Sequence, residues 1–410
     1  LNLYETKKMY VERINVFGNS ITDDHVVRAQ MISDEGDPFN KTLLTKSINN
    51  LKALRIFESV DYKVEQGSTK DKKILNIFIE EKPTGEISAG AGVGTSGSTI
   101  GFAIKENNYL GRGIKLDASL NLSEESIRGI FAVDNPNFKF SGNSLHTSVH
   151  SQATDKMSTS GYKSTLSGIS LGSGFEQWED IYLLPTISTN FESLDTTSDA
   201  STNLKKQDGE YFTTKFTYNI IRDKRNQSFQ PTDGNRIVFK QSLPVYADSP
   251  TILNGLEYVN YYSPIDDITT SFRFFSRAVN GFGDEDVRIS ERVFVPSKYL
   301  RGFEAGRIGP VDSGEHVGGN LATAVGFNTS FPNMFKAINA DLSFFFDTAN
   351  VWGVDYKDQW GESSKIRSSF GTSVDWLTPI GPLNFSLSQA ITKKATDLEE
   401  SFRFDLGTTF

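Results

Sequence analysis

A glycine-rich stretch in the first quarter of the chain has the spacing of a nucleotide-binding loop. Gly92, Gly94 and Gly97 match the pattern G-x-G-x-x-G, in which glycines let the backbone approach a pyrophosphate. Such a site needs a strand before the glycines and a helix after them. Residues 99–105 alternate between apolar and polar side chains, as a strand does. We therefore predict no nucleotide partner and no cofactor, and interpret the stretch as a glycine-rich strand.

The four histidines lack the spacing of a metal site. His146 and His150 share a face only in a helix; in a strand they would lie roughly 13 Å apart at a rise of ~3.3 Å per residue. His25 and His316 are isolated, and we interpret all four as ordinary surface histidines. Aspartates such as Asp223 lie in predicted turns. These observations predict no metal, no catalytic residue and no enzymatic activity.

The most informative polar residue is an arginine inside a long irregular segment, at about residues 281–318. It occurs in the run Leu300-Arg301-Gly302-Phe303, where apolar residues flank the charge and Gly302 permits a tight backbone. A loop of this length within a strand-rich domain is usually functional or disordered. We predict that it folds back into the interior of a barrel and is anchored there through Arg301. An exposed basic turn is the alternative.

The first eighty residues predict a small α/β domain in the order β-α-α-β-β. Residues 10–17 alternate as a half-buried strand, and a helix capped by Thr22 or Asp23 follows. Leu44, Ile48, Leu51 and Leu54 have helical spacing within a second helix at about 41–55. Strands are expected near 57–65 and 73–81. Pro83-Thr84-Gly85 ends this domain, which we place at residues 1–83.

The remaining chain, residues 84–410, has the composition and period of a membrane barrel. The whole chain combines 31 Phe and 34 Gly with only 37% hydrophobic residues, and it contains no run of 18 apolar residues that would predict a membrane-spanning helix. Segments of period two recur, for example Phe344 and Phe346 opposite Ser343 and Asp347. Apolar residues would face lipid and polar residues the lumen. We predict an all-β membrane fold: an antiparallel transmembrane barrel of about sixteen strands, preceded in the chain by one small α/β domain. The net charge of −9 argues against nucleic acid as a partner.

The two ends of this barrel must meet, because closure removes unpaired strand edges. The glycine-rich strand at about 86–94 comes first, and an alternating strand ending on Phe410 comes last. Glycine weakens a strand. We therefore predict a weak lateral seam, formed by Ile87, Gly90, Gly92, Gly94, Phe402, Phe404, Leu406, Gly407 and Phe410.

Two sets of motifs resemble known families. The β-α-α-β-β order, with Val16-Phe17-Gly18-Asn19 and Phe57-Glu58-Ser59-Val60, resembles a POTRA domain. That resemblance implies that the domain captures extended polypeptide at a sheet edge. A purely structural role is the alternative. The later motifs together resemble the BamA family of outer-membrane protein assembly factors. They are Leu300–Phe303, Ile308–Pro310, Gly318–Asn320, Phe346–Trp352, Trp376–Leu383 and the terminal strand.

The resemblance implies the last POTRA domain, in the periplasm, and the barrel, in the bacterial outer membrane. It implies unfolded outer-membrane protein clients, accessory lipoproteins of the BAM complex, a periplasmic chaperone and outer-membrane lipids as partners. Clients would add strands at an opening seam. The family pairs the arginine at 301 with the aspartate at 347; where many relatives have a further acid nearby, this chain has Asn328. A polypeptide-transport pore, as in two-partner secretion translocators or the autotransporter assembly factor, and an ordinary porin are the alternatives.

Overall fold

The computed structural model describes residues 8–95, 97–198, 200–228, 230–265, 267–283, 286–335, 340–355, 365–378 and 381–409. Its contacts divide the chain into two units. The first contains residues 1–87, 104–118 and 132–145, and the second contains the rest. Among the described residues, no helix combines the length and apolar character needed to cross a membrane.

The N-terminal part of the first unit is a three-stranded sheet covered by helices. Its strands are β1 (Tyr10–Phe17), β2 (Phe57–Gln66) and β3 (Lys72–Glu81), in the order β1-β3-β2, with β1 parallel and β2 antiparallel to β3. The helices are α1 (Asp24–Arg28) and α2 (Lys41–Ala53). The predicted β-α-α-β-β order is therefore confirmed.

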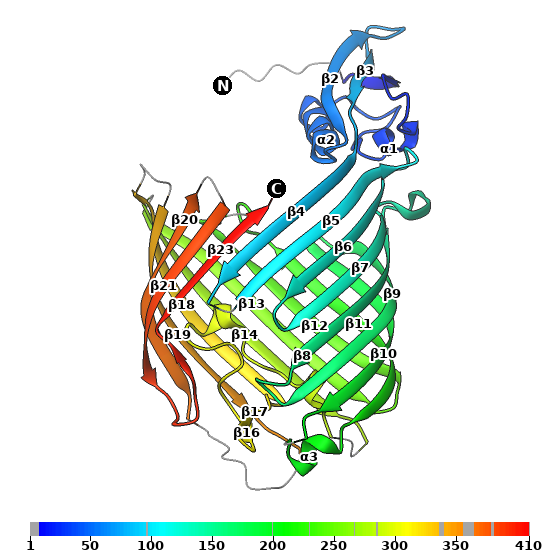
Figure 1. Cartoon of the computed structure of the whole chain (residues 1–410). Helices are drawn as coiled ribbons and strands as arrows, with labels where there is room; N and C mark the ends of the chain where they lie inside the picture. The colour runs from blue at the N-terminus through cyan, green and yellow to red at the C-terminus, as the bar shows by residue number, and fades with distance from the viewer. Residues whose placement is uncertain are drawn as a thin grey trace. The chain divides into compact units, whose positions relative to one another are not determined.

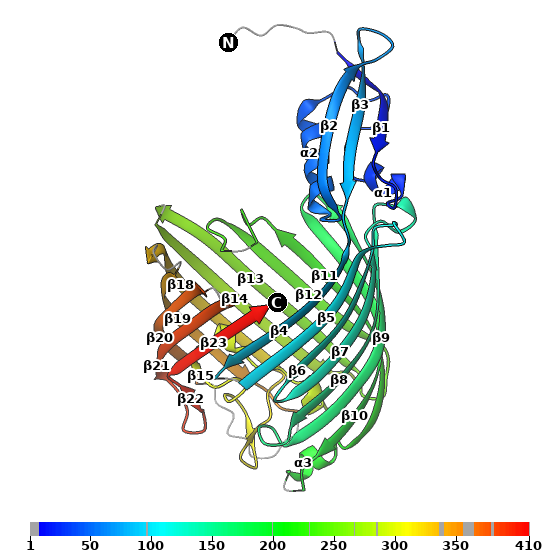
Figure 2. The ribbon, with the colours of Figure 1, turned by 45° about the horizontal axis from the view of Figure 1, so that its top comes forward.

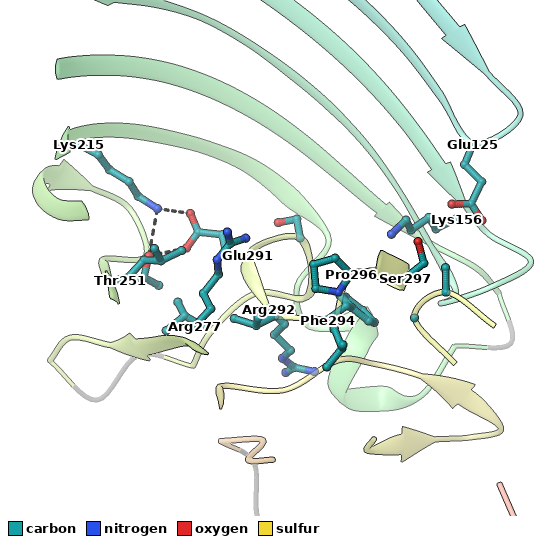
Figure 3. Close-up of a pocket in the computed structure, with 17 residues that line it drawn as sticks. Glu125, Lys156, Lys215, Thr251, Arg277, Glu291, Arg292, Phe294, Pro296 and Ser297 are labelled. Carbon is teal, nitrogen blue, oxygen red and sulfur yellow. Dashed lines mark hydrogen bonds and ion pairs between the residues drawn. The ribbon is translucent and has the colours of Figure 1, made fainter. Parts of the chain in front are cut away.

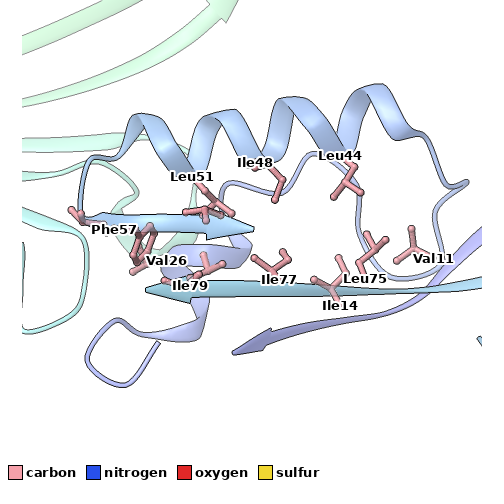
Figure 4. Packing of buried hydrophobic residues seen from close by; sticks show 13 residues of the cluster. Val11, Ile14, Val26, Leu44, Ile48, Leu51, Phe57, Leu75, Ile77 and Ile79 are labelled. Carbon is pink, nitrogen blue, oxygen red and sulfur yellow. The ribbon is translucent and has the colours of Figure 1, made fainter. Parts of the chain in front are cut away.

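Helical spacing positions α2 over this sheet. The side chain of Asn40 caps the helix by accepting hydrogen bonds from the backbone N–H groups of Thr42 and Leu43. Leu44, Ile48 and Leu51 then lie on one face and are buried against the sheet (Figure 4). Burial of this apolar stripe is the main contribution to the stability of the layer.

The second architecture is a closed antiparallel barrel of sixteen strands, as predicted. Its strands are β4 (Gly85–Gly94), β5 (Gly97–Tyr109), β6 (Ile114–Ser123), β7 (Ser126–Asn135), β8 (Ser144–Lys156), β9 (Tyr162–Trp178), β10 (Ile181–Thr196), β11 (Gly209–Asp223), β12 (Gly234–Ala247), β13 (Thr251–Ile265), β14 (Ile268–Gly281), β18 (Leu321–Phe335), β19 (Ala340–Trp352), β20 (Arg367–Thr378), β21 (Gly381–Thr392) and β23 (Phe402–Thr409). Consecutive strands are neighbours, and β23 lies beside β4 (Figure 1).

The period-two pattern separates the two faces of each strand. In β19, Phe344 and Phe346 are exposed, whereas Ser343, Phe345 and Asp347 are buried. Along this strand the outward face is apolar, and the inward face carries Ser343 and Asp347 together with Phe345, a pattern expected for strands between lipid and a wet interior. Strand β5 occupies the position where a nucleotide site would need a helix, so the glycine pattern forms a hairpin between two strands.

The segment between β14 and β18 lies inside the ring of strands (Figure 2). It contains η2 (Ile289–Glu291), η3 (Ser297–Tyr299), β15 (Gly302–Phe303), β16 (Val311–Asp312) and β17 (Glu315–His316). Several of its apolar residues form one buried cluster with residues of β14, β18 and β19; from the segment these are Val287, Val293, Val295, Tyr299, Leu300, Phe303 and Ile308. We call this segment the lumen loop.

Candidate functional site

The lumen loop is joined to the barrel wall by an ion pair between Arg301 and Asp347. Arg301 Nε lies 2.7 Å from Asp347 Oδ2, and Nη2 lies 2.9 Å from Oδ1, so the guanidinium donates two parallel hydrogen bonds. The backbone N–H of Arg301 donates a third to Oδ2 at 3.2 Å. The Asp347 side chain is fully buried. Two-pronged contacts of this kind fix direction as well as distance.

Local packing explains why this short run can reach the wall. Leu300 and Phe303 are buried on either side of the arginine. Gly302 has a φ of +90°, and a Cβ there would lie 3.1 Å from the Cβ of Ser369 and 3.3 Å from that of Ser388. Only glycine tolerates both this dihedral and this approach to β20 and β21.

The sequence did not reveal that Asp347 serves two arginines. Arg273 Nη2, from β14, donates to Asp347 Oδ1 at 3.2 Å. The guanidinium of Arg301 also lies over the ring of Phe345, 3.5 Å from its centroid. The side chain of Asn328 donates to Ser330 Oγ at 3.0 Å. One carboxylate is therefore shared by two arginines. The lumen-facing position of Arg273 was the one signal of this in the sequence.

The second site is the seam between β4 and β23. Among the residues that the structure describes, five pairs join the strands, from Asp405 opposite Gly94 to Thr409 opposite Gly90. Fourteen pairs join β10 to β11. A Cβ on Gly94 would lie 2.6 Å from the carbonyl oxygen of Phe404, so glycine lets β23 approach here. Over the described residues the seam has about a third of the residue pairs of that wall junction, and the same number as the junction of β21 and β23.

The predicted seam residues do not all face one another. Gly90, Gly92 and Gly94 lie opposite β23, and Leu406 and Gly407 lie opposite β4. Phe402 and Phe404 instead pair with Leu387 and Phe385 of β21. Ile87 is an exposed residue of β4 outside the paired stretch. Phe410 lies outside the described residues.

A cavity of about 530 Å³ lies beside the lumen loop, lined by charged residues (Figure 3). Lys215 Nζ and Glu291 Oε1 are 2.5 Å apart within it, and Thr251 also donates to Glu291. Burial tends to raise the pKa of Glu291, but Lys215 and Arg288 outweigh this and hold the pKa below its usual range. Glu291 is therefore an ionised structural partner.

The part of the chain that the structure describes contains no group of three or more His, Cys, Asp or Glu side chains that could hold a metal ion. His150 Nε2 shares a hydrogen bond with Asn190 at 2.9 Å. The interpretation of His316 as a surface residue is wrong, because β17 packs it into the interior with 3% exposure. A two-residue strand leaves too little periodicity for the sequence to show this.

Comparison with known proteins identifies the family of this chain. The family model described as the Omp85 superfamily domain matches residues 108–410. The chain belongs to the Omp85 superfamily. A POTRA model, described as surface antigen variable number repeat, matches residues 9–82.

Several curated relatives align with most or all of this Omp85 chain. Outer membrane protein assembly factor BamA of Neisseria meningitidis serogroup B is 26% identical, covering 100% of this chain and 58% of the relative. BamA of Neorickettsia risticii is 23% identical, covering 100% and 56%. The human sorting and assembly machinery component 50 homolog is 24% identical over 91% of this chain and 84% of that protein. The chain thus spans little more than half the length of these two BamA relatives.

Solved structures share the fold. The crystal structure of BamA from Haemophilus ducreyi lacking POTRA domains 1–3 has a TM-score of 0.85 and 24% identity, covering 99% of this chain and 85% of that one. CdiB from Acinetobacter baumannii has a TM-score of 0.59 and 12% identity, with 98% and 74% coverage. The sixteen-stranded architecture is therefore that of a known Omp85 barrel.

Proposed function

We propose that this chain inserts and assembles β-barrel proteins in the bacterial outer membrane. In this proposal residues 1–83 are a POTRA domain in the periplasm and residues 84–410 are the transmembrane barrel that holds the lumen loop. The names of the BamA relatives support this function. The chain acts without a cofactor or a catalytic residue. Its partners are unfolded client proteins, accessory lipoproteins of the BAM complex, a periplasmic chaperone and lipid.

The short seam between β4 and β23 is the observation that carries the proposal. In hydrocarbon each unpaired peptide group costs several kcal/mol, so an incoming strand needs an edge on which to pair. Separating the five pairs described at this seam breaks fewer hydrogen bonds, and so costs less free energy, than separating the fourteen between β10 and β11. A client strand that pairs with β4 recovers the lost hydrogen bonds, as in other cases of strand addition. The folded client is lower in free energy, so no nucleotide is needed.

A disulfide across the seam tests this mechanism. The chain contains no cysteine, so introduced pairs are unambiguous. Ala91 and Thr408 lie directly opposite each other, at a separation that cross-strand disulfides span. Ala91→Cys with Thr408→Cys should stop client folding in liposomes when oxidised and restore it when reduced. Thr189→Cys with Thr214→Cys, across β10 and β11, is the matched control and should leave folding unchanged.

The readouts separate this function from transport. Normal client folding by the oxidised seam variant would refute the opening seam. Steady large conductance without client folding would instead favour a polypeptide-transport pore.

A further inference from the structure

The connection between β21 and β23, residues 393–401, turns onto the lumen loop. Its two-residue strand β22 (Glu399–Glu400) pairs with β15, placing Glu400 opposite Gly302 and Glu399 opposite Phe303. Two backbone hydrogen bonds extend this pairing, from Glu304 N–H to the carbonyl of Leu398 at 3.0 Å and from Leu398 N–H to the carbonyl of Arg307 at 3.2 Å. The residues just before the last barrel strand are thus bonded to the residues just after Arg301.

A second ion pair holds this connection in place. Arg367, from β20, donates from Nε and Nη2 to the two carboxylate oxygens of Asp397 at 2.8 and 2.7 Å. Both side chains are fully buried. Arg367 also donates to Asn350 and to the carbonyl of Lys365, while the backbone N–H of Lys394 donates to Asp397 at 2.6 Å. A buried pair of this kind is weak evidence for stability, because desolvation offsets the attraction. What it specifies is one position for the chain that carries it.

The pairing of β23 shows why that position matters. Residues 402–406 pair with β21, whereas residues 405–409 pair with β4. The first half of the strand is therefore held by the wall, and the second half forms the seam. Only one residue, Ser401, separates β22 from β23, and its carbonyl accepts from the N–H of Ser388 at 2.8 Å. Any shift of the connection is passed directly to the strand that closes the barrel.

We propose that Arg367 and Asp397 are positioning residues for the seam. They hold the connection 393–401 against the lumen loop, and this sets the place of β23 beside β4. The purpose of this arrangement rests on the proposed function, since it would couple the lumen loop to the opening of the seam. The positioning itself is a property of the barrel and is testable without a client.

Two variants break the connection by different routes, each with a matched control. Leu398→Pro removes the N–H that donates to the carbonyl of Arg307. It removes few packing contacts, because the Leu398 side chain is exposed. Leu398→Ala keeps that N–H and is its control. Asp397→Asn leaves Arg367 without its counter-charge. Glu399→Gln, which breaks the exposed pair with Lys393 in the same connection, is its control.

Amide hydrogen exchange of the full chain in bilayers gives the readout, with peptides covering residues 88–94 and 402–409 reporting on the seam. Leu398→Pro and Asp397→Asn should each speed exchange there by about fivefold, the factor for roughly one hydrogen bond. The two controls should not change it. A peptide covering 209–223, in the wall, should exchange at its original rate in all four variants. If Asp397→Asn does not fold, hydrogen exchange at the seam in Leu398→Pro tests the proposal alone.

Two results would overturn the proposal. One is an unchanged seam in Leu398→Pro while residues 398–400 exchange faster. The other is equal acceleration at the seam and in the wall, since that would make the pair a general stabiliser. A loosened seam with unaltered client folding would leave the positioning role intact and count against the proposed function.

Discussion

Replacing Asp347 should destabilise the barrel more than replacing Arg301, although the two residues form one ion pair. Asp347 accepts hydrogen bonds from Arg301 and also from Arg273, at 3.2 Å. Asp347→Asn therefore removes two attractions and leaves two arginines beside each other without a counter-charge. Arg301→Gln removes one attraction, and the carboxylate keeps Arg273 and the backbone N–H of residue 301.

The magnitudes follow from burial. A charge pair at ~4 Å is worth about 4 kcal/mol at an effective dielectric near 20. Removing one member of a buried pair typically costs about 3–5 kcal/mol. Because the Asp347 side chain is fully buried, we expect Asp347→Asn to lower the free energy of unfolding by about 4 kcal/mol. Arg301→Gln should lower it by about 2 kcal/mol, since lost charge-assisted hydrogen bonds are partly replaced by Arg273.

Urea unfolding in lipid bilayers, with heat-modifiable migration on gels as a second measure, compares the variants. Asp180→Asn is the control, because Asp180 and Lys224 form an exposed pair whose loss should cost under ~0.5 kcal/mol. Equal losses for Asp347→Asn and Arg301→Gln, or a larger loss for Arg301→Gln, would show that Arg273 does not share the carboxylate.

Three further predictions concern the seam, the loop and the first sheet. Gly94→Ala should lower the free energy of unfolding by about 1–3 kcal/mol and speed hydrogen exchange at residues 402–409, because the added Cβ would meet the carbonyl oxygen of Phe404. Gly129→Ala is the control and should have neither effect, because a Cβ at Gly129 would enter open space. Gly302→Ala should destabilise the barrel in urea more than Gly283→Ala: both have positive φ, but only Gly302 also meets neighbouring side chains. Burial alone would raise the pKa of Glu81, but hydrogen bonds from Thr22, Ile21 and Ser20 lower it to about 2. Since this folded pKa lies below the usual 4.5, the stabilisation is present above pH ~4.5 and is lost as the pH falls towards 2. Hydrogen exchange at the amides of residues 21 and 22, corrected for its intrinsic pH dependence, should become faster in the wild type as the pH falls from 4.5 to 2. In Glu81→Gln it should not change with pH. After solvent screening, the loss of stabilisation at low pH should be about 1 kcal/mol.

The sequence alone predicted the α/β order of the first sheet and a barrel of about sixteen strands with an apolar and a polar face. Period-two alternation predicted the barrel strands, and helical spacing of Leu44, Ile48 and Leu51 predicted the core of the first sheet. These signals are local, because a strand or helix exposes its periodicity within about ten residues. The run around Arg301 was also recognisable, since an arginine between apolar residues in a long loop needs a buried partner.

Only the tertiary structure decided which groups meet. Arg273 and Asp347 lie 74 positions apart, and Arg367 and Asp397 lie 30 apart on different elements. A lumen-facing charge in the sequence does not name its partner, because closure and register set that partner. The stagger of β23, which pairs first with β21 and then with β4, has the same origin. The period of the sequence assigns a side chain to one face of a strand, whereas closure of the barrel decides how many residue pairs join its first strand to its last.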